Sequence, residues 1–347
     1  MMSISEEHVR EALRSVRYPG FSRDIVSFGL VKNVQIANGE IKVQLAIATN
    51  DPNVPATIKS EAEKILGALN GVRSAKVLID IQAPPGGAGA TVGAQRIPGI
   101  KHVIAVASGK GGVGKSTVAA NLAVALEQSK ARVGLCDCDI YGPSISLMFG
   151  TRERPTATDE NKIIPIEQYN LKLMSMGFLL DDTSPAILRG PMVTRYTQQF
   201  LRQVDWGELD FLVLDLPPGT GDIQLTIVQT VALSGAIIVT TPQEVALIDA
   251  RKAATMFEKV NVPVLGLIEN MSYFVSPSDQ KRYDIFGSGG GEREAKRLRV
   301  PLLGQIPIDI ATREASDRGQ PIVGEDRQSP VAKEFVRIAK HLRETLP

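Results

Sequence analysis

Cysteine, aromatic side chains and net charge are all scarce in this chain. Its 347 residues include two cysteines, one tryptophan and 5% aromatic residues, and the formal charge is +1. The two thiols, Cys136 and Cys138, are one residue apart, which excludes a disulfide framework and is a poor spacing for a closed metal site. Because the charges nearly cancel, nothing global attracts the chain to nucleic acid or anionic lipid. We therefore expect neither nucleic acid nor a membrane among its partners.

Long apolar runs are missing as well. Apolar runs such as residues 236–239 are short and bounded by other residue types, whereas a transmembrane helix needs about 20 consecutive apolar residues. Residues 1–7 show neither the basic nor the apolar region of a secretory signal. These features predict a cytoplasmic protein. The 43% apolar and 22% charged residues are ordinary for a soluble globular fold.

Patterning divides the chain into two domains and a linker. Residues 1–83 predict a small α/β domain, and residues 84–99 are rich in Gly, Pro and Ala, which is typical of a flexible linker. The expected elements of the small domain are helices at 6–16 and 58–69, a hairpin that turns at Asn38-Gly39, and a strand at 75–81. Residues 100–347 form the second predicted domain.

The second domain alternates short strands with helical stretches. Its strands are apolar on both faces, as in the centre of a parallel sheet that helices cover. They are expected at 103–107, 133–137, 211–215, 236–240 and 264–268. This alternation predicts a doubly wound, mostly parallel α/β domain, in which ligands bind at the carboxyl ends of the strands.

A phosphate-binding loop follows the first of these strands. The pattern is G-x-x-x-x-G-K-[ST] between a strand and a helix, the setting that the P-loop requires. Its residues are Gly109, Lys110, Gly111, Gly112, Val113, Gly114, Lys115, Ser116 and Thr117. Glycines let successive N–H groups surround a phosphate, and the next helix adds its positive end. We predict that the loop binds ATP, with Lys115 on the β- and γ-phosphates and Ser116 on Mg²⁺.

Polar residues at other strand ends complete the predicted nucleotide site. Asp137 and Asp139 follow the second strand, where two carboxylates can serve Mg²⁺ and the attacking water. Asp215 ends an apolar strand in the Walker B manner, which places it near the Mg²⁺ ion. Asn270 follows the last predicted strand, and its amide can donate to and accept from the adenine edge.

Several of these motifs carry a family resemblance. Lys110 makes the loop similar to the deviant Walker A signature of the MinD/ParA/Mrp group of dimeric ATPases, and 137–144 resembles the switch I of the Mrp branch. The segments 175–178, 189–192, 269–274, 285–291 and 303–307 resemble the Mrp/ApbC family. Residues 24–31 are similar to the small α/β domain of iron–sulfur assembly factors.

The resemblance implies a role for each of these residues. Lys110 would reach the partner's nucleotide across a homodimer, Asp139 would position the attacking water, and Asp137 would support the metal shell. Pro307 would help Asn270 to read the adenine. The chain would hydrolyse ATP and carry a [4Fe-4S] cluster at the dimer interface for apoproteins or assembly factors.

The cluster ligands expected from the resemblance are replaced. Most relatives have C-x-x-C after the N-M-S-Y-F segment, whereas this chain has Ser276-Pro277-Ser278-Asp279. Serine is a poor cluster ligand because its hydroxyl stays protonated at neutral pH. Cys136 and Cys138 bracket Asp137, so a cluster there would collide with ATP, and Cys136 is better explained as a core residue.

Two other functions remain open. The first is a MinD/ParA-like positioning switch, in which dimerisation with ATP creates a surface that binds membrane or DNA. Residues 331–346 form an amphipathic stripe that would suit it, but a terminal helix packed on its own domain is the commoner explanation of such a stripe. The second is an assembly adaptor that carries no cluster and engages partners through residues 1–83.

Overall fold

The computed structural model describes residues 5–16, 24–26, 30–37, 39–48, 53–82, 94–158, 162–179 and 190–346. The chain divides into two units, Met1–Thr91 and Val92–Pro347, and each is described by itself. Asn38 of the predicted hairpin turn and residues 83–93 of the predicted linker lie outside the described residues.

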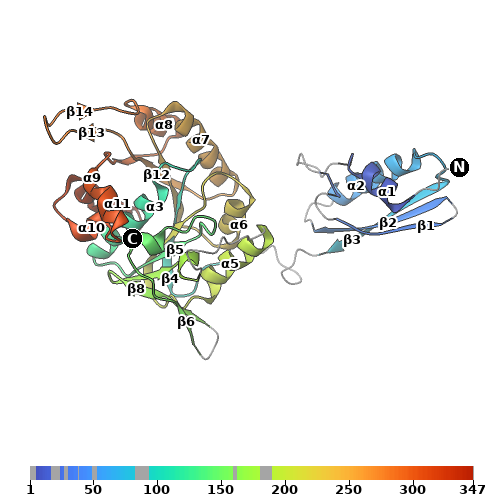
Figure 1. The fold of residues 1–347 in the computed structure, drawn as a ribbon, viewed down its shortest axis with the longest axis horizontal. Coiled ribbons are helices and arrows are strands. Elements are labelled where there is room, and N and C mark those ends of the chain that lie inside the picture. The colour runs from blue at the N-terminus through green and yellow to red at the C-terminus, as the bar shows by residue number, and fades with distance from the viewer. Residues whose placement is uncertain are drawn as a thin grey trace. The chain divides into compact units, whose positions relative to one another are not determined.

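The smaller unit is a three-stranded sheet with two helices. Its elements are α1 (Glu6–Leu13), β1 (Val31–Ala37), β2 (Glu40–Ala48), α2 (Asn53–Gly67) and β3 (Ser74–Gln82). Strands β1 and β2 pair antiparallel up to the predicted hairpin, whereas β2 and β3 are parallel. Figure 1 shows both helices on one side of this sheet. Alternate residues such as Ile41, Val43 and Leu45 are therefore buried beneath the helices, as period-two patterning predicts.

The larger unit is built on an eight-stranded sheet, which confirms the predicted fold class. The strand order is β15-β12-β11-β4-β10-β5-β9-β8, and every pairing is parallel except that of β8 with β9. The strands are β4 (Ile100–Ala107), β5 (Val133–Asp137), β8 (Ile166–Gln168), β9 (Leu171–Met174), β10 (Leu209–Asp215), β11 (Gly235–Thr240), β12 (Val264–Glu269) and β15 (Leu302–Gln305). The five predicted strands are all present, and β8, β9 and β15 extend the sheet at its edges.

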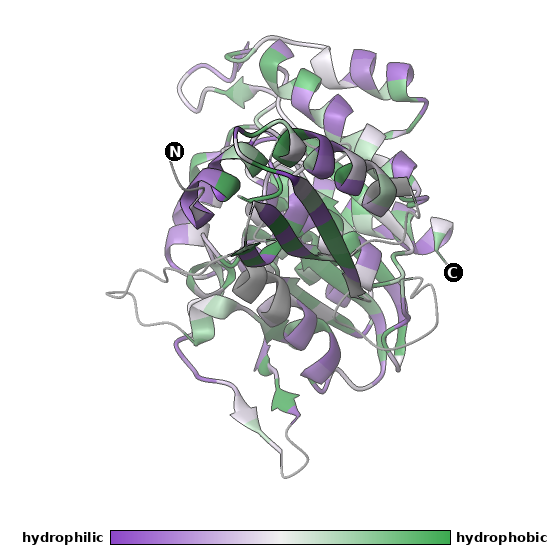
Figure 2. Cartoon of the chain, turned by 90° about the vertical axis from the view of Figure 1, so that its right-hand side faces the viewer, coloured by the Kyte–Doolittle hydropathy of each residue, from purple (hydrophilic) through white to green (hydrophobic). Residues whose placement is uncertain are grey.

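Helices cover the sheet, and two short ribbons project from it. The helices are α3 (Lys115–Gln128), α4 (Ile145–Met148), η1 (Met176–Phe178), α5 (Gly190–Gln203), α6 (Asp222–Thr230), α7 (Glu244–Lys259), α8 (Gly290–Leu298), α9 (Ile310–Asp317), α10 (Ile322–Glu325) and α11 (Pro330–Thr345). The ribbons pair β6 (Thr156–Ala157) with β7 (Ile163–Ile164), and β13 (Phe274–Val275) with β14 (Arg282–Tyr283). Hydrophobic and hydrophilic bands alternate along the helices in Figure 2, as expected where one face is buried.

The start of the larger unit differs from the predicted boundary at residue 100. Gln95 forms a parallel bridge with Val231, and Ile97 is buried in the core beside Val103. Residues 95–97 therefore pack with the larger unit, because Ile97 gains a buried environment there.

The amphipathic stripe near the C-terminus packs inward. On α11, Val331, Phe335, Ile338 and Leu342 are buried in the same core as α3. The stripe is thus accounted for by the protein's own core. In the part of the chain that the structure describes, no helix combines the length and apolar character needed to cross a bilayer.

Candidate functional site

The P-loop connects the carboxyl end of β4 to α3. Helix α3 begins at Lys115, so Lys115, Ser116 and Thr117 form its first turn. Gly114 caps the helix with a φ of 79°, and a Cβ there would lie 2.2 Å from Asn270 Nδ2. The loop thus requires glycine at residue 114 for both its backbone angle and its close neighbour.

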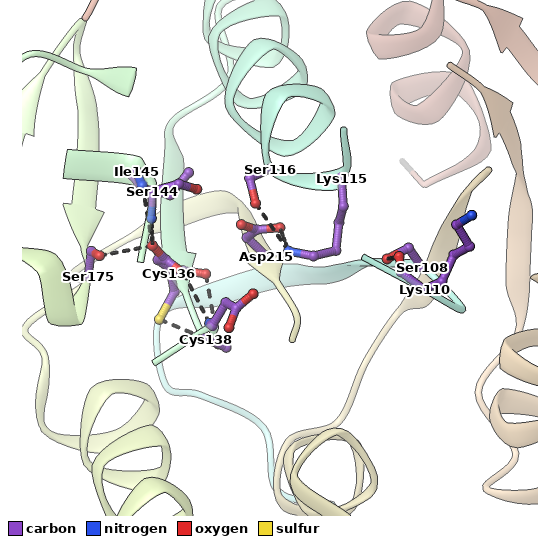
Figure 3. Close-up of polar contacts among 12 residues, drawn as sticks. Ser108, Lys110, Lys115, Ser116, Cys136, Cys138, Ser144, Ile145, Ser175 and Asp215 are labelled. Atoms are coloured by element: carbon purple, nitrogen blue, oxygen red, sulfur yellow. Dashed lines mark hydrogen bonds and ion pairs between the residues drawn. The ribbon is translucent and has the colours of Figure 1, made fainter. Parts of the chain in front are cut away.

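Lys115 and Asp215 form a buried ion pair at this site. The Lys115 Nζ donates to Asp215 Oδ1 and lies 3.2 Å from the Ser116 Oγ. Lys115 is 6% exposed and Asp215 is fully buried. Figure 3 shows the three side chains meeting between the start of α3 and the end of β10. The structure therefore brings together the three residues that the sequence assigned to phosphate and Mg²⁺.

Asp137 holds the segment that follows β5. Its Oδ2 accepts hydrogen bonds from the N–H groups of Ser144 and Ile145 at 3.1 and 3.3 Å, and from the Ser175 hydroxyl at 2.9 Å. Its Oδ1 accepts from the Asp139 N–H at 3.0 Å. Burial, together with the charge of Asp215, raises the pKa of Asp137 to about 7. Asp137 thus holds residues 139–145 in place, a role that the sequence did not indicate.

Asp139 is half-buried beside this network. Burial raises the pKa of its carboxyl, and the positive charge of Lys115 opposes that shift. A carboxylate with a raised pKa beside a phosphate site is suited to orient a water or to accept its proton.

The segments that carry Asn270 and Pro307 are bonded to each other, and Asn270 is bonded to the P-loop. Two backbone bonds join their segments, from Ser272 N to Ile306 O and from Ile306 N to Glu269 O, each 2.9 Å long. Asn270 is 8% exposed, and its Nδ2 donates to Val113 O at 2.9 Å. The predicted adenine reader is therefore anchored on the P-loop itself.

Lys110 differs from Lys115 in its surroundings. Its carbonyl accepts a hydrogen bond of 2.9 Å from Ser108 Oγ. Its side chain extends away from the Lys115–Asp215 pair (Figure 3). Within the described part of the chain, no ion pair of its ammonium with a carboxylate is found. The Lys110 side chain therefore takes no part in the buried Lys115–Asp215 pair.

Glu269 was not among the predicted site residues, although it precedes Asn270. It is fully buried and accepts hydrogen bonds from Ser272 Oγ at 2.7 Å, from Gln305 Nε2 at 2.8 Å and from the Gly291 N–H. One carboxylate thus ties together three segments that the family resemblance had singled out separately. Glu269 and Ser175 each lie in a segment that resembles the family, and this could have marked them as site residues. Nothing in the sequence specified their hydrogen-bond partners.

The β13–β14 hairpin carries the segment that replaces C-x-x-C. Ser276 Oγ lies 2.9 Å from Ser278 Oγ, and Tyr283 Oη donates to Asp279 Oδ2 at 3.1 Å. The backbone N–H of Lys281 bonds Asp279 at 3.1 Å, and this bond, with that of Ser276, lowers the pKa of the Asp279 carboxyl. The tip is an exposed oxygen-rich turn with no sulfur in its sequence.

The two cysteines are core residues. Cys136 and Cys138 are fully buried, with their sulfur atoms 3.9 Å apart. The hydrogen bond to Cys136 and burial raise the pKa of Cys138 well above that of an ordinary thiol. In the described part of the chain, no three His, Cys, Asp or Glu side chains are grouped to hold a metal ion.

Comparison with known proteins identifies the family. The family model described as NUBPL iron-transfer P-loop NTPase matches residues 99–343. The chain belongs to this family. A second model, described as iron–sulfur cluster assembly protein, matches residues 6–79. Both parts of the predicted family resemblance are therefore confirmed.

Curated relatives of this P-loop NTPase match over different lengths. The iron–sulfur cluster carrier protein of Synechocystis sp. is 43% identical over 98% of this chain and 97% of its own. The iron–sulfur cluster transfer protein NUBPL of Mus musculus is 51% identical over 71% of this chain and 78% of its own. The first of these shares both units, whereas the second aligns over a length closer to that of the larger unit.

Solved structures of similar fold include nucleotide-bound proteins. A nucleotide-binding protein from Archaeoglobus fulgidus, in complex with ADP, has a TM-score of 0.61 and 39% identity, over 69% of this chain and 94% of that one. The cell division ATPase MinD of Pyrococcus furiosus has a TM-score of 0.55 and 26% identity, over 71% and 99%. The predicted MinD/ParA-like architecture is confirmed.

Proposed function

We propose that this chain is a homodimeric Mg-ATP hydrolase that serves the transfer of iron–sulfur clusters to apoproteins, and that it acts in the cytoplasm. The observation that carries the hydrolase part is the buried Lys115–Asp215 pair beside Ser116 at the start of α3. The transfer part rests on family membership and on the names of the relatives. No nucleic acid or membrane partner is proposed.

The residues beside the P-loop suit a hard divalent cation. Asp215 Oδ2 is buried and has no hydrogen-bond partner among the described residues. The Lys115 ammonium is bonded both to Asp215 Oδ1 and to the Ser116 hydroxyl, so it links the two side chains. Mg²⁺ prefers such oxygen ligands together with substrate phosphates. Ser116 and Asp215 would hold the ion, and Asp137 would support it from behind. When bound, Mg²⁺ would neutralise the phosphate charge that develops during transfer.

Nucleotide binding would change the partner of Lys115. The triphosphate would replace Asp215 as the main anion next to the ammonium, while the N–H groups of 109–117 surround the phosphates. Asn270 and Pro307 would receive the adenine. Because burial raises the pKa of Asp139, its carboxylate would accept a proton from the attacking water more readily than an exposed one.

Hydrolysis would require a second subunit. The Lys110 side chain points away from the Lys115–Asp215 pair of the same chain (Figure 3). In this proposal it supplies its positive charge to the nucleotide of the partner. A cation delivered in this way is worth about 10³–10⁵ in rate for related phosphoryl transfers.

The cargo site is proposed to depend on a partner's thiolates. Cluster binding needs thiolate ligands, and Cys136 and Cys138 are buried, while the hairpin has Ser276 and Asp279 where relatives have cysteines. We propose that an apoprotein or assembly factor provides the missing ligands. A second candidate, an adaptor that never contacts a cluster, is favoured by the same burial of both thiols.

Mixing two inactive variants tests the dimeric hydrolase. If Lys110 acts in trans and Asp139 in cis, Lys110→Ala and Asp139→Ala subunits together form a mixed dimer with one intact site. Random exchange should then restore roughly a quarter of wild-type phosphate release, since half the dimers are mixed and each has one active site of two. No restoration after verified subunit exchange would contradict the trans arrangement.

A further inference from the structure

A cavity lies between the ends of α4 and α9. It has a volume of about 380 Å³, and no P-loop residue lines it. Its walls come from α4, from η1, from the segment after α4 and from the end of α9. The lining includes three arginines, Arg152, Arg154 and Arg318, and one acidic residue, Asp317.

Two glycines make this cavity by letting the helix ends meet. Gly150 and Gly319 have φ values of 62° and 77°, and a Cβ on Gly319 would lie 2.2 Å from the Gly150 Cα. The segments that follow α4 and α9 therefore pack backbone against backbone. Because this contact brings residues 150–154 next to 317–319, arginines from distant parts of the chain share one hollow.

The residues that line the hollow carry a positive formal charge, from three arginines and one aspartate. The Asp317 carboxylate is already paired with Arg313 at 3.0 Å, on the exposed side of α9. Arg318 uses Nη2 to bind Glu325 at 2.6 and 2.9 Å, so the other N–H groups of its guanidinium remain for a second acceptor. Planar guanidinium groups bind phosphate and carboxylate oxygens in pairs.

The walls of the cavity are connected to the nucleotide site. Ser146 follows Ile145, whose N–H donates to Asp137. On the other wall the Gly177 N–H donates to Ser175 Oγ at 3.0 Å, and this hydroxyl donates to Asp137. A molecule in the cavity would therefore touch two segments that one carboxylate of the nucleotide site holds in place.

We propose that this cavity binds a small polyanion of the phosphate or carboxylate class, separately from the P-loop. Its volume is within the range of about 300–1,000 Å³ that is typical of small-molecule sites. Arg152, Arg154 and Arg318 each present a guanidinium group to the anion, and the exposed Leu147 is part of the lining.

Calorimetric titration with pyrophosphate and, separately, with citrate tests the proposal. The full chain is first saturated with ADP and Mg²⁺, so that the P-loop is filled, and retention of ADP is checked. We expect at least one of the two anions to bind, with one anion per chain. Binding of pyrophosphate only would indicate a phosphate site, and binding of citrate only would indicate a carboxylate site. Arg152→Gln/Arg154→Gln should weaken binding at least tenfold, and Leu147→Glu should weaken it by placing a carboxylate in the lining.

A matched pair of surface arginines controls for overall charge. Arg297→Gln/Arg299→Gln removes the same charge from exposed positions at the end of α8 and should change the affinity less than twofold. Equal weakening by both pairs, or no binding of either anion, would overturn the proposal. If ADP does not bind, the nucleotide proposal fails instead, and the dependence on Arg152 and Arg154 still decides this one.

Discussion

At the P-loop, Lys115 and Asp215 are buried and paired with each other, whereas at the tip of the β13–β14 hairpin Asp279 is exposed and bonded within its own turn. Both regions follow parallel strands of one sheet, and both correspond to motifs of the same family. The first region keeps every residue type that nucleotide chemistry needs. The second has Ser276 and Asp279 where the family resemblance predicts cysteine. The comparison separates the proposed nucleotide site of this chain from the proposed means of holding a cluster.

The largest effect should come from Lys110. Lys110→Ala should lower ATP hydrolysis by about 10³-fold or more, because a trans cation is lost from the transition state, while ATP binding is largely kept. Phosphate release and nucleotide affinity measure the two parts. Lys281→Ala, at the exposed hairpin tip, should leave hydrolysis unchanged. Normal turnover of the Lys110 variant would remove the distinction between the two regions.

A smaller effect, on stability, is expected when either of two glycines with similar backbone angles is replaced by alanine. Gly114 and Gly287 have φ values of 79° and 88°, but a Cβ would meet Asn270 Nδ2 at 2.2 Å in the first case and nothing within 4 Å in the second. Gly287→Ala should cost about 1–2 kcal/mol for the left-handed backbone. Gly114→Ala should cost about 1–3 kcal/mol more, because the added methyl overpacks the site.

Thermal denaturation measures this difference. For a unit of this size each kcal/mol corresponds to a shift of about 2–4 °C in the melting midpoint. Equal shifts for Gly114→Ala and Gly287→Ala would mean that the contact between the P-loop and Asn270 is looser than the structure indicates.

The smallest effects should be on the pH dependence of stability, to which Asp137 and Asp279 contribute with opposite signs. The pKa of Asp137 is raised from 3.8 to about 7, so its contribution to stability is complete below about pH 4 and is lost as the pH rises through about 7. The pKa of Asp279 is lowered, so its contribution is present above about pH 4 and is lost as the pH falls.

Melting of nucleotide-free protein between pH 3 and pH 8 checks these signs. Asp137→Asn should remove a decline in stability toward neutral pH, and Asp279→Asn should remove a loss in acid. If both substitutions removed a decline of the same sign, burial would not distinguish the two carboxyl groups.

The sequence predicted the parts of this molecule that depend on local pattern. The P-loop, the five central strands and the stripe on α11 are each continuous in sequence, and the structure contains them. The edge strands β8, β9 and β15 have three or four residues each, which is too short for a clear period. They form because longer strands are already beside them.

The partners of buried polar groups could not be predicted in the same way. Ser175 lies 38 residues from Asp137, and Gln305 lies 36 residues from Glu269. Such contacts depend on how β9 and β15 are placed against their neighbours. For the same reason the sequence offered Asp137 as a support for the metal, and its anchoring of switch I became visible only in the structure.

Anaerobic reconstitution with iron and sulfide tests the central claim most directly. The full chain and a Ser276→Cys/Asp279→Cys variant are compared by visible absorbance and by iron content per chain. We predict no stoichiometric cluster on the wild-type chain alone and a gain of cluster in the variant. A stoichiometric cluster on the wild-type chain that is lost when Cys136 and Cys138 are replaced by serine would contradict the account.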